Sequence, residues 1–120
     1  MANRLGVRGK LDVGSSTLLD TMSEDGMWYV VFEDDGVTGY FYAVDRSGES
    51  QSIRCALHIY NVRDLPEDDP PSTVDIVWST DDEAVALAIN DVPHAAFDLL
   101  DSRAICRTGT GAGEFQSPSE

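Results

Sequence analysis

The chain has 120 residues, of which 42% are hydrophobic, and this is enough for one domain whose core needs no metal or disulfide. Its 22 acidic and 8 basic residues give a formal net charge of −14. That charge argues against nucleic acid as a direct ligand, because phosphate contacts need clustered Lys and Arg. No apolar run approaches the ~20 residues of a membrane-spanning helix. The basic N-terminal stretch lacks the apolar segment of a secretory signal, so we expect a cytoplasmic protein.

The acidic residues gather where turns are expected, at positions 24–25, 33–35, 67–69 and 81–83. Aspartate is itself a turn former. This distribution is typical of a solubilising surface. It also permits a basic protein partner, which the net charge would attract over long range. The sequence favours the first interpretation and leaves the second open.

In chain order, residues 1–9 are predicted to be a flexible N-terminus. Residues 10–19 can hold one short strand, with Leu11 and Val13 on the same face. Residues 23–26 then form a turn that leads into the most strongly patterned part of the chain.

That part is residues 27–45, MWYVVFEDDGVTGYFYAVD, which predicts a β-hairpin. Asp35-Gly36 lies between two apolar runs and suits a type I′ turn, which needs a positive φ at both central residues. This turn sets Phe32 opposite Gly39. The glycine leaves the gap that an aromatic ring lying over the strand would need.

Alternation along the two strands separates two apolar faces. The first is typical of a core and carries Trp28, Val30, Phe32, Phe41 and Ala43. The second carries Met27, Tyr29, Val31, Tyr40, Tyr42 and Val44. Tyrosine combines a large contact area with a hydroxyl that can stay hydrated. The second face is therefore either covered by the protein's own chain, which the pattern favours, or a binding or dimer surface.

After a turn at residues 46–50, residues 52–60 alternate as a half-buried strand does. Ile53, Cys55, Leu57 and Ile59 are predicted to face the core. The opposite side chains join the hairpin tyrosines if this strand is the hairpin's neighbour. A candidate binding face for a small anion or a peptide then consists of Tyr29, Tyr40, Tyr42, Arg54, His58 and Tyr60. An ordinary outer sheet face is the favoured alternative.

Residues 61–72 hold three prolines and four acids and predict a loop. Residues 73–79 predict a strand with Val74, Ile76 and Trp78 inward. Residues 84–90 alternate with period two, and we predict a strand that forms a hairpin with the preceding one. A helix is the alternative, because residues 80–83 could also be a capping box.

Residues 93–101 predict a short helix, capped by Asp91, begun by Pro93, and with Phe97 and Leu100 packed inward. Residues 102–107 can form a last short strand. We therefore expect an α+β fold in a single domain over residues 10–107. It would contain one antiparallel, meander-like sheet of five or six strands and one short C-terminal helix. The Gly/Ser-rich residues 108–120 are expected to be a disordered tail.

Candidate chemistry is sparse in this sequence. Cys55 and Cys106 form no metal or redox motif, and Cys55 is predicted to be a buried, inert thiol. A cytoplasmic chain disfavours a disulfide between them without excluding it. His58 and His94 lack the spacing of metal ligands. No nucleophile, phosphate-loop or dinucleotide motif occurs. We predict no cofactor, no metal and no catalytic residue, and enzymatic activity is left open but not favoured.

The run VVFEDDGVTGYFYAVD, followed by ALHIYNV and then by VWS, LAIN and PHAAFDL, resembles a family of short bacterial proteins defined as a domain of unknown function. The resemblance covers residues 27–107, and the first run is its most specific part. It implies a bacterial source, a cytoplasmic location and a strand at residues 84–90. It implies no activity, cofactor or catalytic residue, and it assigns no role to the tail at 108–120.

Two classes of function follow. The first is a small, acidic, non-enzymatic protein-interaction module that uses the tyrosine and histidine face or the acidic rim, for instance an immunity or antagonist protein that neutralises a basic toxin or nuclease. The second is a small-ligand-binding protein or weak enzyme with a concave pocket over Tyr40, Tyr42, Arg54, His58 and Tyr60. A homodimer joined through the tyrosine face is compatible with either class.

Overall fold

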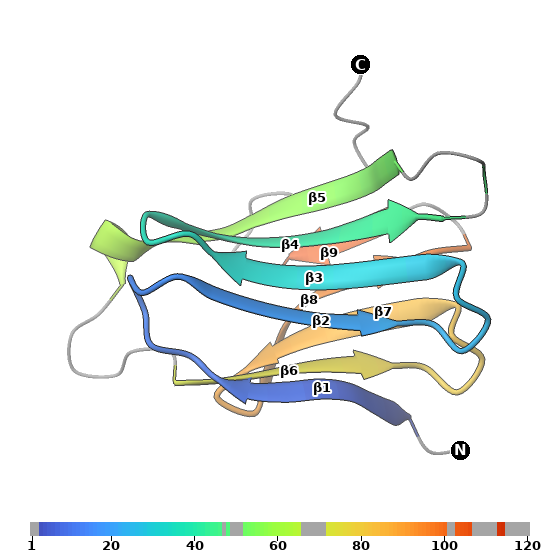
Figure 1. The fold of residues 1–120 in the computed structure, drawn as a ribbon, viewed down its shortest axis with the longest axis horizontal. Helices are drawn as coiled ribbons and strands as arrows, with labels where there is room; N and C mark the ends of the chain where they lie inside the picture. Colours follow the sequence, from blue (N-terminus) through green and yellow to red (C-terminus); the bar gives the residue numbers. More distant parts are fainter. Residues whose placement is uncertain are drawn as a thin grey trace.

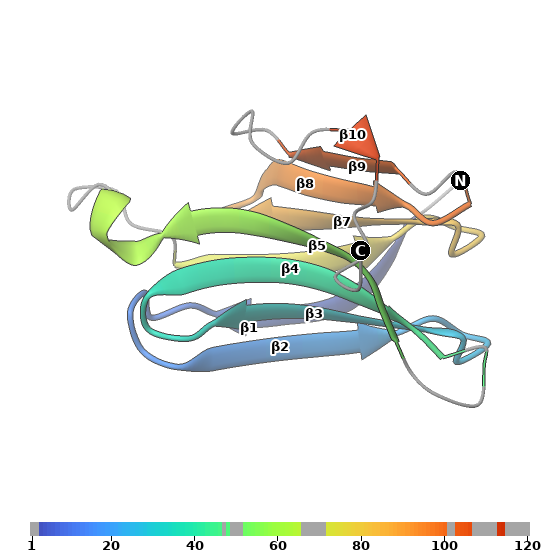
Figure 2. The ribbon, with the colours of Figure 1, turned by 90° about the horizontal axis from the view of Figure 1, so that it is seen from above.

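Two antiparallel sheets lie face to face in the computed structural model of the chain (Figures 1 and 2). The structure describes residues 3–46, 48, 52–65, 72–100, 103–106 and 113–114. One sheet has four strands in the order β2-β3-β4-β5, and the other has six in the order β1-β6-β7-β8-β9-β10. The fold of this part of the chain is therefore a β-sandwich.

The bounds of the strands follow the chain closely. They are β1 (Arg4–Lys10), β2 (Thr17–Met22), β3 (Trp28–Asp34), β4 (Thr38–Asp45), β5 (Ser52–Asn61), β6 (Thr73–Trp78), β7 (Ala84–Ile89), β8 (Val92–Asp98), β9 (Arg103–Cys106) and β10 (Gly113–Glu114). A single 3₁₀ turn, η1 (Val62–Asp64), follows β5 among the described residues.

The expected fold class, an α+β domain with one sheet and a C-terminal helix, is wrong. The described residues contain two sheets and no α-helix. The strands predicted at 52–60, 73–79, 84–90 and 102–107 are confirmed as β5, β6, β7 and β9. What the sequence did not indicate is that β6 to β9 leave the first sheet and form a second layer. Two layers are needed because the inner sides of both sheets are apolar and must cover each other.

The helix predicted at residues 93–101 is instead strand β8. Asn90 and Asp91 both have a positive φ, of 53° and 66°, and Ile89 pairs with Val92. These are the features of a two-residue type I′ hairpin, which ties β8 to β7. Alanine and leucine in this segment favour a helix locally, but tertiary pairing overrides that preference.

The N-terminal part also differs from expectation. Residues 4–9, predicted to be flexible, form most of β1, which pairs with β6. The single strand expected over 10–19 is absent, since β1 ends at Lys10 and β2 begins at Thr17. Parts of the predicted turn at 46–50, of the loop at 61–72 and of the tail at 108–120 lie outside the described residues.

The central hairpin forms, but its turn lies one residue further along the chain than predicted. Only Gly36 has a positive φ there, of 97°, and Asp35 N–H donates to the carbonyl of Thr38. A glycine at the first of two central positions is the pattern of a type II′ turn. Phe32 therefore pairs with Phe41 rather than with Gly39. The register moves by two residues, so each side chain stays on its predicted face.

The core lies between the sheets and joins them through aromatic side chains. Phe41 of β4 and Phe97 of β8 stack with ring centroids 4.6 Å apart and planes 7° apart, and both are fully buried. Trp78 is also fully buried and donates its indole N–H to Thr21 Oγ1 at 3.1 Å, which connects β6 to β2. Contacts between distant strands therefore hold the two layers together.

One edge of the sandwich is closed by β1 against β2. A Cβ added to Gly9 would lie 2.6 Å from Leu19 Cδ2, so the glycine allows the two strands to approach closely. At the end of this edge, Arg4 pairs with Asp82 at 2.8 Å, and Asp82 also accepts the backbone N–H of Glu24 at 2.8 Å. The turns β2–β3 and β6–β7 are thereby linked.

A substitution at Phe97 distinguishes the strand from the predicted helix. Phe97→Ala should lower the free energy of unfolding by about 3–5 kcal/mol, because it removes half of the stacked pair from the core. Leu100→Ala should change it by less than ~0.5 kcal/mol, since Leu100 is 70% exposed. Urea unfolding of both variants measures this. A similar loss for both would contradict the strand, because a helix would bury both side chains.

Candidate interaction surface

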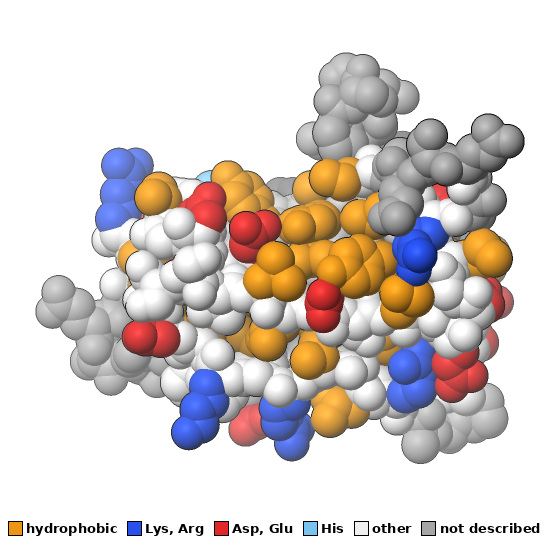
Figure 3. Space-filling model, in the orientation of Figure 1, with side chains coloured by type: hydrophobic (Ala, Val, Ile, Leu, Met, Phe, Trp, Pro, Cys, Tyr) orange, Lys and Arg blue, Asp and Glu red, His pale blue; other side chains and the backbone are white. Residues whose placement is uncertain are grey.

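The outward side chains of β2 to β5 form one continuous surface, which we call the outer face. Strand register arranges it in three rows that cross β2, β3, β4 and β5 in that order. The rows are Leu18, Glu33, Tyr40 and His58; Asp20, Val31, Tyr42 and Ala56; and Met22, Tyr29, Val44 and Ile53. Figure 3 shows this side of the molecule, with apolar side chains gathered across its middle. No described strand or helix lies over it (Figures 1 and 2).

Several of the exposed apolar side chains lie on the outer face. Leu18 is 54% exposed, Ile53 42% and Tyr40 38%. Val31 and Val44 are buried, yet they belong to the outer face and not to the core between the sheets. A contiguous exposed apolar surface of this kind is typical of an interaction site in a protein of this size.

Two carboxylates stand among these apolar side chains. Asp20 accepts a hydrogen bond from the hydroxyl of Tyr29, and Glu33 accepts one from Tyr42 at 3.4 Å. The hydrogen bond to Asp20 raises the pKa of Tyr29 to about 12. Burial, together with Glu33, raises the pKa of Tyr42. Both tyrosines therefore stay neutral, and each partly shields a negative charge on the face.

Positive and aromatic groups lie toward β5. Arg54 is exposed at a bulge of β5, where the register shifts between the pairs Ala43–Cys55 and Val44–Ile53. His58 lies beside Tyr40, with ring centroids 5.9 Å apart, and its Nε2 is 2.9 Å from Asn61 Oδ1. The bulge also turns Ile53 outward, although the sequence predicted it inward.

The structure thus brings five of the six predicted site residues to the same side of the sheet: Tyr29, Tyr40, Tyr42, Arg54 and His58. Tyr60 is the exception. A second bulge leaves Ile59 unpaired between the pairs Gly39–Tyr60 and Tyr40–His58, so Tyr60 turns into the interior. One extra residue in a strand reverses the face of every side chain beyond it.

Inside the sandwich, Tyr60 belongs to a buried group of hydrogen-bonded polar atoms around Asp34, which we call the buried node. Its ring lies over Gly39, where an added Cβ would be 2.6 Å from the ring carbon Cζ. Its hydroxyl donates to Asp34 Oδ2 at 2.8 Å, and the N–H groups of Gly36 and Gly14 donate to the same carboxylate at 2.8 and 3.2 Å. Burial and this hydrogen bond raise the pKa of Tyr60. The node joins the β1–β2 loop, the β3–β4 turn and β5.

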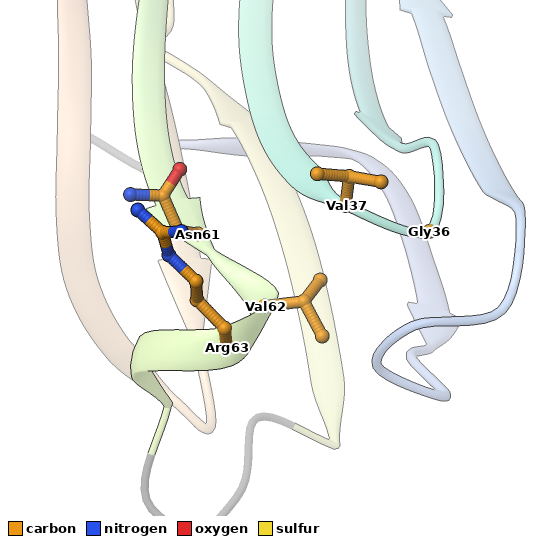
Figure 4. A pocket seen from close by; sticks show the side chains of 5 residues that line it. All are labelled: Gly36, Val37, Asn61, Val62 and Arg63. Atoms are coloured by element: carbon orange, nitrogen blue, oxygen red, sulfur yellow. The ribbon is translucent and has the colours of Figure 1, made fainter.

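The small-ligand interpretation requires a pocket over the six predicted residues. The structure instead has a pocket at the end of the sheet, beside the β3–β4 turn. It has a volume of about 410 Å³ and is lined by Gly36, Val37, Asn61, Val62 and Arg63. Figure 4 shows the β3–β4 turn on one side of it and the end of β5 with η1 on the other. None of the six predicted residues lines it. Its one cationic side chain, Arg63, is 87% exposed and lies 3.9 Å from Asp64.

Other candidate chemistry has structural explanations. Cys55 is buried as predicted, and burial raises the pKa of its thiol to about 12. The side chain of Cys106 lies outside the described residues, so the expectation about a disulfide stays a prediction. Within the described part of the chain, no group of three or more His, Cys, Asp and Glu is placed to hold a metal ion. No helix in that part has the length and apolarity to cross a bilayer.

Sequence reasoning missed the residues that β2 and the bulge contribute to the outer face: Leu18, Asp20, Met22 and Ile53. The segment TLLDTM lacks clean alternation, so it gave no strand signal. Glu33 was assigned to a turn, and the shifted register shows that it belongs to β3. Its side chain lies in the same row as Tyr40.

The fold and its outer face define a small β-sandwich with one apolar, tyrosine-rich sheet surface. The chain matches, over residues 11–119, the model of a family described as "Uncharacterized protein conserved in bacteria (DUF2251)", and it belongs to this family. The expected family membership is thereby confirmed.

A protein of Haemophilus influenzae that carries the name "Uncharacterized protein" is 44% identical to the chain over 70 residues. The match covers 58% of this chain and 44% of the relative, so the chain spans less than half of that protein. No solved structure matches the chain.

The buried node makes a specific prediction about Tyr60. Tyr60→Phe removes one of three donors to a buried carboxylate and should lower the free energy of unfolding by about 1–3 kcal/mol. Tyr40→Phe is the matched control, with an expected change below ~0.5 kcal/mol, because its ring lies on the exposed outer face. Urea unfolding compares them. Equal effects would contradict the inward position of Tyr60.

The contact between Tyr29 and Asp20 predicts a tyrosine that resists ionisation. The absorbance change on forming tyrosinate, taken as the difference between wild type and Tyr29→Phe, should give Tyr29 a pKa of about 12. Asp20→Asn removes the negative charge and should lower this pKa toward the ordinary ~10. Asp25→Asn, in the neighbouring turn, is the control and should leave it unchanged. A wild-type Tyr29 that ionises near ~10 would show that the hydrogen bond is absent.

Proposed function

We propose that this protein is a non-enzymatic protein-interaction module, which binds a protein partner through its outer face. The observation that carries the proposal is that the outer face is apolar and tyrosine-rich and has no described element over it. Tyrosine and exposed aliphatic side chains supply the contact area of protein interfaces. The proposal includes a cytoplasmic location, which is the location expected from the sequence.

The alternative, a small-ligand site or weak enzyme, loses support because its residues are not assembled. It required Tyr60 beside Arg54 and His58, and Tyr60 faces the other side of the sheet. Asp20 and Glu33 accept hydrogen bonds from tyrosine hydroxyls on an open surface rather than in a pocket. Small-molecule sites are usually concave and enclose their ligand.

A basic protein and a second copy of the chain are the occupants that the sequence leaves open. A basic partner fits an immunity or antagonist protein and would be attracted by the net charge of −14. A second copy would instead use the charges of the face itself. Both occupants require the same apolar contacts, so the function can be tested before the occupant is known.

The test removes exposed apolar side chains that the fold does not need. A variant with Leu18→Ser, Tyr40→Ser and Ile53→Ser should weaken association, with itself or with another protein, on the order of 100-fold, because such contacts dominate binding energy. The measurements are sedimentation velocity of the purified full chain and cross-linking followed by mass spectrometry in lysate of the source bacterium.

The control carries the same kind of change elsewhere. Leu5, Val92 and Leu100 are also exposed, but they lie off the outer face, so replacing these three with serine should leave association unchanged. Circular dichroism checks that both variants fold. Association that survives in the outer-face variant, that is lost equally in the control, or that is absent from wild type would each overturn the proposal.

A further inference from the structure

We propose that the occupant of the outer face is a second copy of this chain, in a two-fold dimer whose axis runs parallel to the strands. The inference rests on the proposed function and names its partner. Its basis is that the charges of the face are divided between opposite sides of the four-stranded sheet. Among the strand residues of the face, acidic groups lie on β2 and β3 and basic groups lie on β5. Arg46, which follows β4, also reaches Met22 at the end of the acidic side.

The acidic side consists of Asp20 and Glu33. Among the described residues, neither carboxylate pairs with a cation, and each accepts a hydrogen bond from a tyrosine hydroxyl. A carboxylate that a partner covers without supplying a cation loses its hydration with no compensating charge, and this opposes binding strongly. Any protein that buries this face must therefore bring positive charge to Asp20 and Glu33.

The basic side has the opposite requirement. Arg54 and His58 lie on the outer edge of the sheet, and Arg54 forms no ion pair with a described residue. A partner that is basic throughout its contact surface would leave Arg54 opposed by like charge. A second copy supplies both signs, because it carries the same face.

The symmetry operation places these charges in register. The two-fold axis lies in the plane of the interface, between β3 and β4. It places β2 of one copy over β5 of the other, and each residue row of one copy lies over the same row of the other. Asp20 shares its row with Ala56, so it would lie beside Arg54 of the second copy. Glu33 would lie beside Tyr40 and His58 of the second copy, since these three share a row. Because the dimer is two-fold symmetric, each of these contacts occurs twice in it.

The apolar rows also match under this operation. Met22 on β2 and Ile53 on β5 are the outer members of one row, so each would cover the other across the interface. Strand spacing of ~4.8 Å and a rise of ~3.3 Å per residue give the face a footprint of roughly 20 Å by 20 Å. Two such faces bury on the order of 1,000 Å² in total, which is the lower range for a specific interface.

The net charge of −14 on each copy opposes association, but this repulsion is weak at the outer face. Acids such as Glu24, Asp81 and Glu83 lie in the turns at one end of the sandwich, not on the outer face. Charges further apart than the Debye length of ~8 Å at physiological salt are largely screened. The contacts on the face itself then decide whether two copies associate.

Charge reversal tests the pairing of Asp20 with Arg54. Sedimentation equilibrium of the full chain should show a wild-type dimer. Asp20→Arg alone, or Arg54→Asp alone, should weaken the dimer on the order of 100-fold, because each homodimer then contains two like-charge contacts. Mixing the two variants should restore a dimer, since both contacts between positions 20 and 54 of the mixed pair then join an arginine to an aspartate. Both positions are exposed, so the fold should tolerate either change.

Glu24→Arg is the control, with the same change of charge in the β2–β3 turn, and it should leave the dimer unchanged. A monomeric wild type, single variants that still dimerise, or a mixture that stays monomeric would each overturn the proposed dimer. If either single variant unfolds, Asp20→Asn and Arg54→Gln replace the two variants. Each alone should weaken the dimer, and their mixture should recover part of the loss, because one of its two contacts again joins Asp20 to Arg54. The proposed function survives such a result if a different protein binds wild type and not the Leu18, Tyr40 and Ile53 variant.

Discussion

The four-stranded sheet carries apolar side chains on both faces, and this constraint shapes the rest of the molecule. Its inner side is covered by the second sheet, where Phe41 stacks on Phe97. Its outer side carries Val31 and Val44 and three tyrosines, and no described element covers it. Antiparallel sheets of sandwiches usually place polar side chains on their outer side. This departure from the usual pattern is what the proposed covering of the outer face would explain.

Hydrogen bonds to the two carboxylates of the outer face explain how this face stays hydrated when no other protein covers it. Tyr29 and Tyr42 donate to Asp20 and Glu33, so the carboxylates have partners in the isolated chain. These hydrogen bonds are on the surface and can be exchanged for charged partners. The same four groups can thus support both a monomer in water and a covered interface.

Much of this was visible in the sequence, because period two is a strong signal in this chain. It placed the strands β3 to β7 and assigned Tyr29, Tyr40 and Tyr42 to a face away from the core. The hairpin turn was shifted, yet the faces were right, since the register error was two residues. The proposed binding role of that face is a separate matter, which the geometry supports and experiments must test.

Some features of the fold could not be predicted from the sequence, because they depend on how single residues pair with the neighbouring strand. The unpaired Ile59 turns Tyr60 inward, and an unpaired residue in a strand has no signature in the pattern. The pair Asn90-Asp91 forms a type I′ turn without a glycine, so the hairpin was not recognised and residues 93–101 were predicted as a helix. The division into two sheets depends on contacts between distant strands, such as that between Trp78 and Thr21.

The most direct test of the central claim, that a second copy covers the outer face, is an intermolecular NMR measurement. Isotope-labelled and unlabelled full chains are mixed, and contacts between the methyl groups of Met22 and Ile53 are recorded. Within one chain these residues lie three strands apart, or about 14 Å, which is too far for such a contact. The proposed dimer predicts a cross-peak between Met22 of one copy and Ile53 of the other. Its absence from a sample that is dimeric by sedimentation would contradict the proposed arrangement.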